Sequence, residues 1–115
     1  SDLLTAKKNF DRAINQATLI LEDRIRNKAM PPNKMVGVVL SNFAFSSVLD
    51  KTVLKVSDNS DEQDGFCNLI RGVTLAFRNI THHHVVTKFS REYALSVCAF
   101  IDVLLQVINE SEKIR

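Results

Sequence analysis

Apolar side chains recur at helical spacing in four stretches of the chain, and turn-forming residues separate these stretches. Within residues 3–29 the apolar positions return every three or four residues, as in a helix with one buried face. These positions are Phe10, Ala13, Ile14, Ala17, Leu21 and Ile25. The predicted polar face carries Lys7, Lys8, Asp11, Arg12, Asn15, Glu22 and Arg26. Pro31 and Pro32 end this helix, because proline cannot donate the next backbone hydrogen bond.

The next segment predicts a shorter and largely buried helix from near Asn33 to about Phe43. It is apolar on several sides through Met35, Val36, Val38, Val39 and Leu40. Its β-branched residues also suit a strand, but no partner strand is evident, so a helix is favoured. Residues 44–59 are predicted to be irregular, with a weakly alternating stretch at 51–56 and a turn at 57–60.

Two further amphipathic helices follow. The first begins at Ser60, which forms a capping-box pattern with Gln63. Its predicted core positions are Phe66, Leu69, Ile70, Val73, Ala76, Phe77 and Ile80. After a connection at 81–89, the second begins at a predicted N-cap, Ser90, and runs to about Glu110. Its predicted core positions are Tyr93, Ala94, Val97, Ile101, Leu105 and Ile108.

Four helices with short connections predict an all-α fold, an antiparallel four-helix bundle formed as one domain over residues 1–115. The composition agrees, since 45% of the 115 residues are hydrophobic and only 3 are glycine and 2 proline. The formal net charge of +2 is too small to indicate a nucleic-acid or membrane partner by itself.

The two cysteines and the hydropathy of the chain bear on its location. Cys67 and Cys98 lie in apolar stretches, where free cysteines behave as small hydrophobic residues. Free thiols in a reduced cytoplasmic interior are favoured over a single disulfide. No run of eighteen uninterrupted apolar residues and no signal peptide is present, so we expect a cytoplasmic protein that does not span a membrane. Since no methionine precedes Ser1, the chain is also compatible with a fragment of a longer protein.

The charge is uneven along the chain. Residues 65–91 contain no Asp or Glu but carry Arg71, Arg78, Lys88, Arg91 and three histidines. A local positive field of this kind attracts phosphate or carboxylate groups, although a solvated basic face is the simplest alternative.

Arg71 and Arg78 are two helical turns apart, so they return to nearly the same side of the predicted helix. We expect the two guanidinium groups to converge on one anion, because each can hold phosphate oxygens bidentately. Gly72, beside Arg71, lowers helix stability by about 1 kcal/mol relative to alanine. A close approach of another helix is the favoured reason for it, and access to a bound group is the alternative.

Asn79 and the histidine run at 82–84 follow Arg78 directly. Histidine can accept and return a proton near neutral pH. An arginine that holds a phosphate and a histidine that moves a proton are the minimum for metal-free RNA cleavage, in which the ribose 2′-hydroxyl attacks the adjacent phosphorus. Two alternatives are a metal site at the histidine run and an exposed polar loop without a role. The metal site is disfavoured because three adjacent residues cannot all point at one ion and no further ligand recurs nearby. We therefore expect no metal and no cofactor.

The segment Arg78-Asn79-x-x-x-His83 resembles the signature of HEPN domains, in which four to six residues separate an arginine from a histidine and a polar residue follows the arginine. Two longer blocks, residues 62–79 and 21–26, resemble the Ymh-type branch of bacterial hypothetical proteins, often carried near defence or mobile elements. The resemblance covers roughly residues 10–108.

The resemblance implies a HEPN-like helical bundle with metal-independent endoribonuclease activity, often that of a toxin or abortive-infection effector in antiviral defence. It implies Arg78 and His83 as the catalytic pair and Asn79 as a supporting residue. His84 also stands at an allowed spacing from the arginine, whereas His82 is one residue too close. Ile80 stands where this branch commonly has a proline.

The resemblance also implies a homodimer in which the motifs of both subunits meet in one cleft. A twofold axis would supply a base and an acid from a single histidine position. We therefore expect RNA as substrate, with Arg71, His82 and His84 as further supporting residues, and an antitoxin or additional domain as a candidate partner. The alternative is a non-catalytic helical module that binds a partner protein or a nucleotide through the same basic face.

Overall fold

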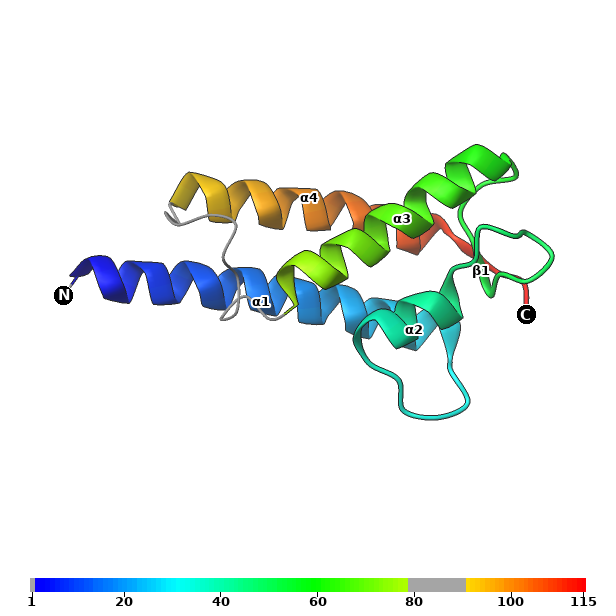
Figure 1. The fold of residues 1–115 in the computed structure, drawn as a ribbon, viewed down its shortest axis with the longest axis horizontal. Helices are drawn as coiled ribbons and strands as arrows, with labels where there is room; N and C mark the ends of the chain where they lie inside the picture. Colours follow the sequence, from blue (N-terminus) through cyan, green and yellow to red (C-terminus); the bar gives the residue numbers. More distant parts are fainter. Residues whose placement is uncertain (1, 79–90) are drawn as a thin grey trace.

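The computed structural model describes the backbone of residues 2–78 and 91–115, and the side chains of residues 9–78 and 91–115. The described chain is an all-α bundle, which confirms the predicted fold class (Figure 1). Its elements are α1 (Asp2–Ala29), α2 (Gly37–Ala44), β1 (Leu54–Lys55), α3 (Ser60–Phe77), α4 (Arg91–Glu110) and β2 (Glu112–Lys113). Ile80, the connection at 81–89 and the predicted N-cap Ser90 lie outside the described residues.

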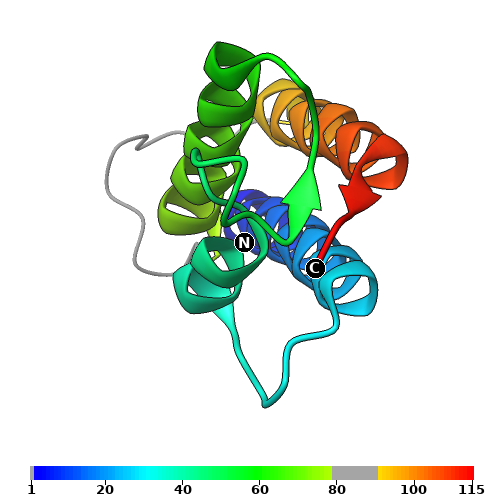
Figure 2. The same ribbon diagram turned by 90° about the vertical axis from the view of Figure 1, so that its right-hand side faces the viewer.

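Helix α1 is the central element, because α2, α3 and α4 all pack against it, while α2 also packs against α3 (Figure 2). The long helices alternate in direction along the chain, so α3 is antiparallel to α1, and α4 is parallel to α1 (Figure 1). Lys28 Nζ donates to the carbonyl oxygens of Ile108 and Asn109, both at 2.8 Å, which places the C-terminal ends of α1 and α4 side by side. A cation at these terminal carbonyls is favourable for α4. Consecutive long helices are therefore antiparallel, α1 to α3 and α3 to α4, whereas α1 and α4 run parallel because α2 is a short side helix and not a full member of the bundle.

The buried face of α1 differs in part from the predicted stripe. Ile14, Leu21 and Ile25 are buried as predicted, whereas Ala13 is exposed. Thr18, Glu22 and Ala29 are buried as well, so the buried face is displaced around the helix from the purely apolar stripe. The helix ends where Met30 adopts a left-handed φ of 53°, just before the two prolines.

The predicted start of α2 is wrong by four residues. Residues 31–36 are not helical, and the helix begins at Gly37, whose φ of 58° lies in the left-handed region that favours glycine. The Gly37 N–H donates to the Glu22 carboxylate on α1. This long-range contact fixes the first residue of α2, and Leu40 and Ala44 then enter the core.

The cores of α3 and α4 follow the predicted periodicity with local corrections. On α3, Ile70 and Val73 are buried, while Leu69 and Ala76 are exposed. On α4, the buried positions are Ala94, Val97, Ile101, Leu104 and Ile108, so Leu104 replaces Leu105 as a fully buried residue. Burying such a side chain contributes about 1.5–3 kcal/mol to stability.

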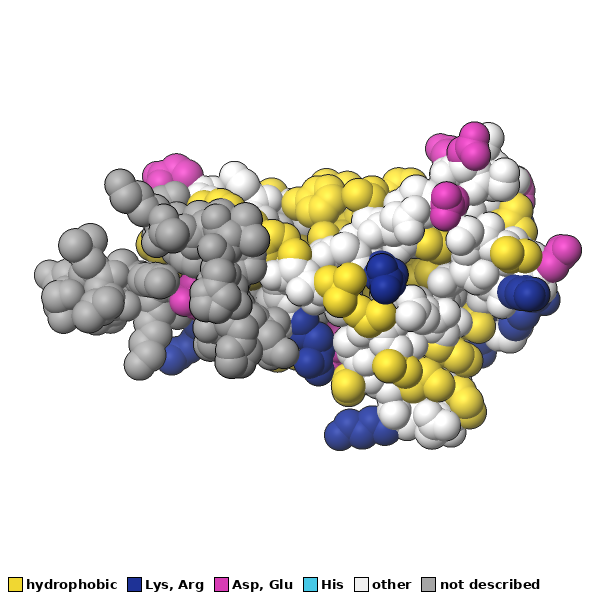
Figure 3. Space-filling view, viewed as in Figure 1, with side chains coloured by type: hydrophobic (Ala, Val, Ile, Leu, Met, Phe, Trp, Pro, Cys, Tyr) yellow, Lys and Arg dark blue, Asp and Glu magenta, His cyan; other side chains and the backbone are white. Residues whose placement is uncertain are grey.

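By length and composition α4 could cross a membrane, and among the described helices it alone meets both conditions. In this structure one side of α4 packs on α1. Its other side exposes Leu95, Phe100 and Val103, and Figure 3 shows hydrophobic side chains along the outer surface of α4. The two cysteines, Cys67 on α3 and Cys98 on α4, are free.

The predicted capping box at the start of α3 is wrong. The N-cap is Asn59, whose Oδ1 accepts the Glu62 N–H at 3.0 Å. Gln63 is fully buried and bonds to the segment before the helix. The helix nevertheless begins at Ser60, as predicted, because Asn59, one residue earlier, supplies the side-chain oxygen that satisfies a terminal donor.

Changing Asn59→Ala is expected to lower the free energy of unfolding by about 1 kcal/mol, because the Glu62 N–H then loses its acceptor. Urea denaturation followed by circular dichroism measures this difference. Ser60→Ala is the matched control and should change stability by only a few tenths of that amount. A larger loss for Ser60→Ala than for Asn59→Ala would contradict the assignment of the cap.

Candidate functional site

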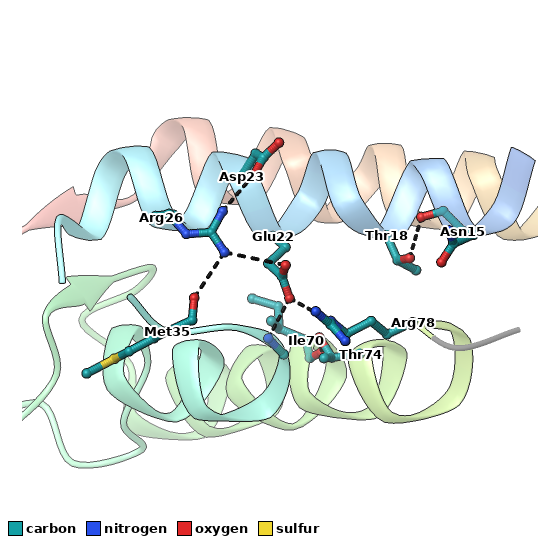
Figure 4. Close-up of polar contacts among 10 residues, drawn as sticks. Asn15, Thr18, Glu22, Asp23, Arg26, Met35, Ile70, Thr74 and Arg78 are labelled. Carbon is teal, nitrogen blue, oxygen red and sulfur yellow. Dashed lines mark hydrogen bonds and ion pairs between the residues drawn. The ribbon is translucent and has the colours of Figure 1, made fainter. Parts of the chain in front are cut away.

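Arg78 lies at the C-terminal end of α3 and reaches toward α1 (Figure 4). Its backbone continues the helix, since the Arg78 N–H donates to the Thr74 carbonyl oxygen at 3.2 Å. Its Nε donates to Glu22 Oε1 at 2.8 Å, and the two side chains are 30% and 10% exposed. The predicted catalytic arginine is therefore half-buried and anchored by a carboxylate from another helix.

Glu22 accepts hydrogen bonds from three groups on three segments of the chain. Besides Arg78 Nε, these are the Gly37 N–H and Arg26 Nη2, the last at 3.4 Å. Burial by itself raises the pKa of Glu22, but the hydrogen bonds from Arg78 and Gly37, the charge of Arg78 and the contact with Arg26 outweigh it. The net pKa is lowered, so Glu22 is a carboxylate at neutral pH.

Arg26 extends this network toward the segment before α2. Its Nη1 donates to Asp23 Oδ1 at 2.6 Å, and its Nη2 donates to the Met35 carbonyl oxygen at 3.0 Å (Figure 4). Two arginines thus face two carboxylates, and their formal charges cancel. We define Glu22, Arg26, Arg78 and the Gly37 N–H as the Glu22 network.

The Glu22 network changes the electrostatic picture drawn from the sequence. Residues 65–91 contain no acidic residue, yet the fold brings a carboxylate of α1 to Arg78. On the face in Figure 3, Lys and Arg side chains of the described residues appear as separate spots and not as one continuous patch. The expected local positive field is therefore partly neutralised at the predicted site.

The sequence reasoning missed Glu22, which it assigned to the solvent-facing side of the first helix. The structure buries Glu22 at 9% exposure. A signal was present, because Ile14, Thr18, Glu22, Ile25 and Ala29 succeed each other at spacings of three or four. An acidic residue in register with a core stripe points to a buried partner.

Arg71 and Arg78 do not meet at a common site. Arg78 engages Glu22 near the start of α2, whereas Arg71 is exposed and lines a hollow that is bordered by residues 41–47 and α3. The interpretation of Gly72 as a point of close helix packing is also wrong. Gly72 is exposed, and no neighbouring atom lies within 4 Å of the position that a Cβ would take.

The other predicted site residues, Asn79, His82, His83 and His84, lie outside the described residues. Within residues 2–78 and 91–115, no group of three or more His, Cys, Asp or Glu side chains is placed to hold a metal ion.

The chemistry that the described geometry offers is that of a held guanidinium. Glu22 engages Nε, which lies on one side of the Arg78 side chain. The outer edge formed by Nη1 and Nη2 is the edge with which arginine grips two phosphate oxygens at once. An arginine held in this way loses less conformational entropy when it binds an anion.

Residues 2–108 match the family described as a protein of unknown function, Hypoth_ymh. No curated protein and no solved structure matches the chain. Because the match covers residues 2–108 of the 115, the chain belongs to the Hypoth_ymh family.

Proposed function

We propose that this protein is a HEPN-type, metal-independent endoribonuclease of the toxin or defence type that acts in the cytoplasm as a homodimer. The observation that carries the proposal is the anchoring of Arg78 by Glu22 at the end of α3. In the sequence this held arginine is followed directly by Asn79 and the histidines at 82–84. A preorganised cation thus precedes a run of proton carriers.

In the proposed reaction the Arg78 guanidinium neutralises the charge that builds on the phosphate oxygens. His83 removes the proton from the ribose 2′-hydroxyl, whose oxygen then bonds to phosphorus while the bond to the 5′-oxygen breaks. The proton that the 5′-oxygen requires comes from a second histidine, and the product is a 2′,3′-cyclic phosphate with a free 5′-hydroxyl. Asn79 orients the scissile group, and His84 is the alternative proton carrier because its spacing from Arg78 is also allowed.

Glu22 is the positioning residue of this proposal. It does not touch the substrate, but it holds Nε of Arg78 and so directs the outer edge of the guanidinium. The homodimer supplies the second histidine, because a twofold axis repeats each residue of the site.

One observation favours a second candidate, a non-catalytic helical module that binds a partner protein or a nucleotide. The carboxylates of Glu22 and Asp23 cancel the charges of Arg78 and Arg26. A phosphate backbone gains less from such a site than from an uncompensated basic cluster.

Purified protein incubated with RNA in EDTA tests the proposal. The wild type is expected to cleave the RNA, and Arg78→Ala and His83→Ala are each expected to slow cleavage about 10²–10⁴-fold. The measurements are the cleavage rate by gel electrophoresis and the detection of 2′,3′-cyclic phosphate ends.

Arg12→Ala is the matched control, since Arg12 is an exposed arginine on α1 outside the Glu22 network. It should leave the rate unchanged. Absence of cleavage in the wild type, or equal cleavage by all variants, would overturn the nuclease proposal. Retained partner or nucleotide binding by His83→Ala, without RNA turnover in the wild type, would support the second candidate.

The same cleavage assay tests whether residues of both subunits form one site. Arg78→Ala and His83→Ala proteins, unfolded together and refolded, form mixed dimers that carry one arginine and one histidine in a common cleft. The mixture should then cleave RNA faster than either variant alone, but more slowly than the wild type, because each mixed cleft holds one arginine and one histidine instead of two of each. A rate equal to the mean of the two separate rates would contradict a site built from both subunits.

A further inference from the structure

A hollow of about 290 Å³ is bordered by the segment from the end of α2 to residue 47 and by the middle of α3. Its lining includes Ser41, Asn42, Ser46, Cys67, Asn68 and Arg71. We call it the Arg71 pocket. The Glu22 network contributes no residue to its lining, so the pocket is separate from the site proposed for RNA cleavage.

Hydrogen-bond donors dominate this lining, and no acidic side chain is part of it. Arg71 forms no ion pair with any carboxylate in the part of the chain that the structure describes. Asp64 is the acidic side chain that approaches the rim, where its Oδ1 lies 3.4 Å from Asn68 Nδ2. A guanidinium, hydroxyl groups and amide groups without a lining carboxylate form a site suited to an anion.

Ser41, which belongs to the lining, has a hydroxyl group without a partner. Ser41 is 3% exposed, and its Oγ is buried without any hydrogen-bond partner. A buried hydroxyl without a partner lowers stability by about 1–3 kcal/mol, so such groups are rare in folded proteins. An acceptor oxygen that enters the pocket would give this hydroxyl a partner.

Hydrogen bonds hold the wall of the pocket that lies opposite α3 in place before any ligand binds. The Ser46 carbonyl oxygen accepts from Gln63 Nε2 at 3.0 Å, and the Ser46 N–H donates to Thr52 Oγ1 at 3.0 Å. The Ser46 hydroxyl oxygen accepts the Val48 N–H at 3.1 Å, so its own hydrogen can still be donated. Donors that are held before binding lose less entropy when the ligand arrives.

Cys67 adds no negative charge to the pocket at neutral pH. Burial, together with the nearby Asp64 carboxylate, raises the pKa of the Cys67 thiol to about 11. The group is therefore a neutral, weakly polar part of the wall.

We propose that the Arg71 pocket binds the phosphate group of a small ligand, with Arg71 holding two phosphate oxygens and Ser41 and Ser46 donating to the others. The pocket is close in size to the smallest ligand sites of proteins, about 300 Å³. It therefore has room for the phosphate and for part of the group that carries it, such as a ribose. This proposal does not rest on RNA cleavage, since a protein without nuclease activity would keep the same pocket.

Isothermal titration calorimetry with the whole chain tests the proposal. The ligands are inorganic phosphate, ribose 5-phosphate and adenosine 5′-monophosphate, and ribose and adenosine are the matched compounds without phosphate. The phosphorylated compounds are expected to bind and the others are not. Tighter binding of the two esters than of inorganic phosphate identifies an ester as the ligand, and equal binding identifies the free ion.

Three variants locate the binding. Arg71→Ala should weaken it about tenfold or more, and Ser41→Ala about three- to tenfold without a loss of thermal stability. Arg12→Gln, a change of an exposed arginine on α1 outside both sites, should leave it unchanged. Binding that Arg71→Ala preserves would place the phosphate outside the Arg71 pocket and overturn the proposal, as would failure of all three phosphorylated compounds to bind.

Alkylation of the two thiols gives a second measurement with an internal control. Near pH 9, a saturating concentration of the tightest of the phosphorylated ligands should slow alkylation of Cys67 at least threefold. The Cys98 rate should not change, because this half-buried thiol on α4 is not part of the lining. Equal Cys67 rates with and without the ligand would place the phosphate elsewhere and contradict the proposal.

Discussion

Replacing Glu22 with alanine is expected to lower the free energy of unfolding by about 2–3 kcal/mol at pH 7. The change leaves the half-buried Arg78 guanidinium and the Gly37 N–H without their acceptor. Removing one partner of a buried ion pair is destabilising by about 3–5 kcal/mol, and the 30% exposure of Arg78 reduces the loss because water reaches the guanidinium. Urea denaturation at pH 7 measures the difference.

Glu22→Gln separates the charge of this residue from its shape. The pKa of Glu22 is lowered in the folded protein, so its contribution to stability is complete above the ordinary value of 4.5. This contribution is lost as the pH falls through the lower pKa that Glu22 has in the folded protein. The wild type should therefore exceed Glu22→Gln in stability most at neutral pH, and the difference should shrink below about pH 4.5. Glu110→Gln, an exposed change at the end of α4, is the control, and a difference that stays constant from pH 7 to pH 3 would contradict the assigned network.

The long helices could be predicted from the sequence because their periodicity is local. The α1 range, 3–29, agrees with the observed bounds to within one residue, and the predicted end of α4 at about Glu110 agrees with the observed end. Each helix shows a repeated apolar stripe, and two prolines follow the end of α1. Information of this kind lies within a few turns of each residue.

The Glu22 network could not be predicted in the same way, since its partners are far apart in the chain. Arg78 lies 56 residues and Gly37 lies 15 residues from Glu22. A hydrophobic pattern predicts that a glutamate faces solvent, because the pattern carries no information about a cation on another helix. The predicted start of α2 was wrong for the same reason, since the N–H of Gly37 bonds to a carboxylate on another helix.

The positions of the two arginines around the helix axis also did not predict that they belong to different sites. Arg71 and Arg78 share a side of α3, but α2 and the segment after it run along that side and offer different partners at its two ends. Gly37 lies beside Arg78, and Ser41 lies beside Arg71 in the lining of the pocket. Two residues on one stripe of a helix thus belong to separate sites.

Gln63 matches a local sequence motif, the capping box, but its side chain bonds to a different segment of the chain. Its Nε2 donates to the carbonyl oxygens of Ser46 and Leu54, at 3.0 and 3.2 Å, and its Oε1 accepts the Val56 N–H at 2.8 Å. The side chain is 0% exposed, so no water replaces these bonds. Gln63 therefore ties the irregular segment between α2 and α3 to the start of α3.

Changing Gln63→Glu is expected to lower the free energy of unfolding by at least about 3 kcal/mol at pH 7. The introduced carboxylate offers no hydrogen to the Ser46 and Leu54 carbonyl oxygens, and it buries a charge without a cation beside it. Since burial raises the pKa of the introduced group in the folded state, stability should recover in part as the pH falls toward 5, where the group gains a proton that it can donate. Urea denaturation from pH 5 to pH 8 measures both effects.

Gln106→Glu is the matched control, because Gln106 is exposed on α4 and its Nε2 donates to Asp102 Oδ2 at 3.1 Å. It should lower stability by less than about 0.5 kcal/mol, through repulsion between like charges one helical turn apart. Gln63→Leu removes the same hydrogen bonds without adding a charge, and a loss of about 2 kcal/mol that does not vary with pH is expected. If Gln63→Glu were no less stable than Gln106→Glu at pH 7, the buried amide would not be the link that holds the segment before α3. The wall of the Arg71 pocket would then lack the support that its preorganisation requires, because the Ser46 carbonyl depends on the same Nε2 donor.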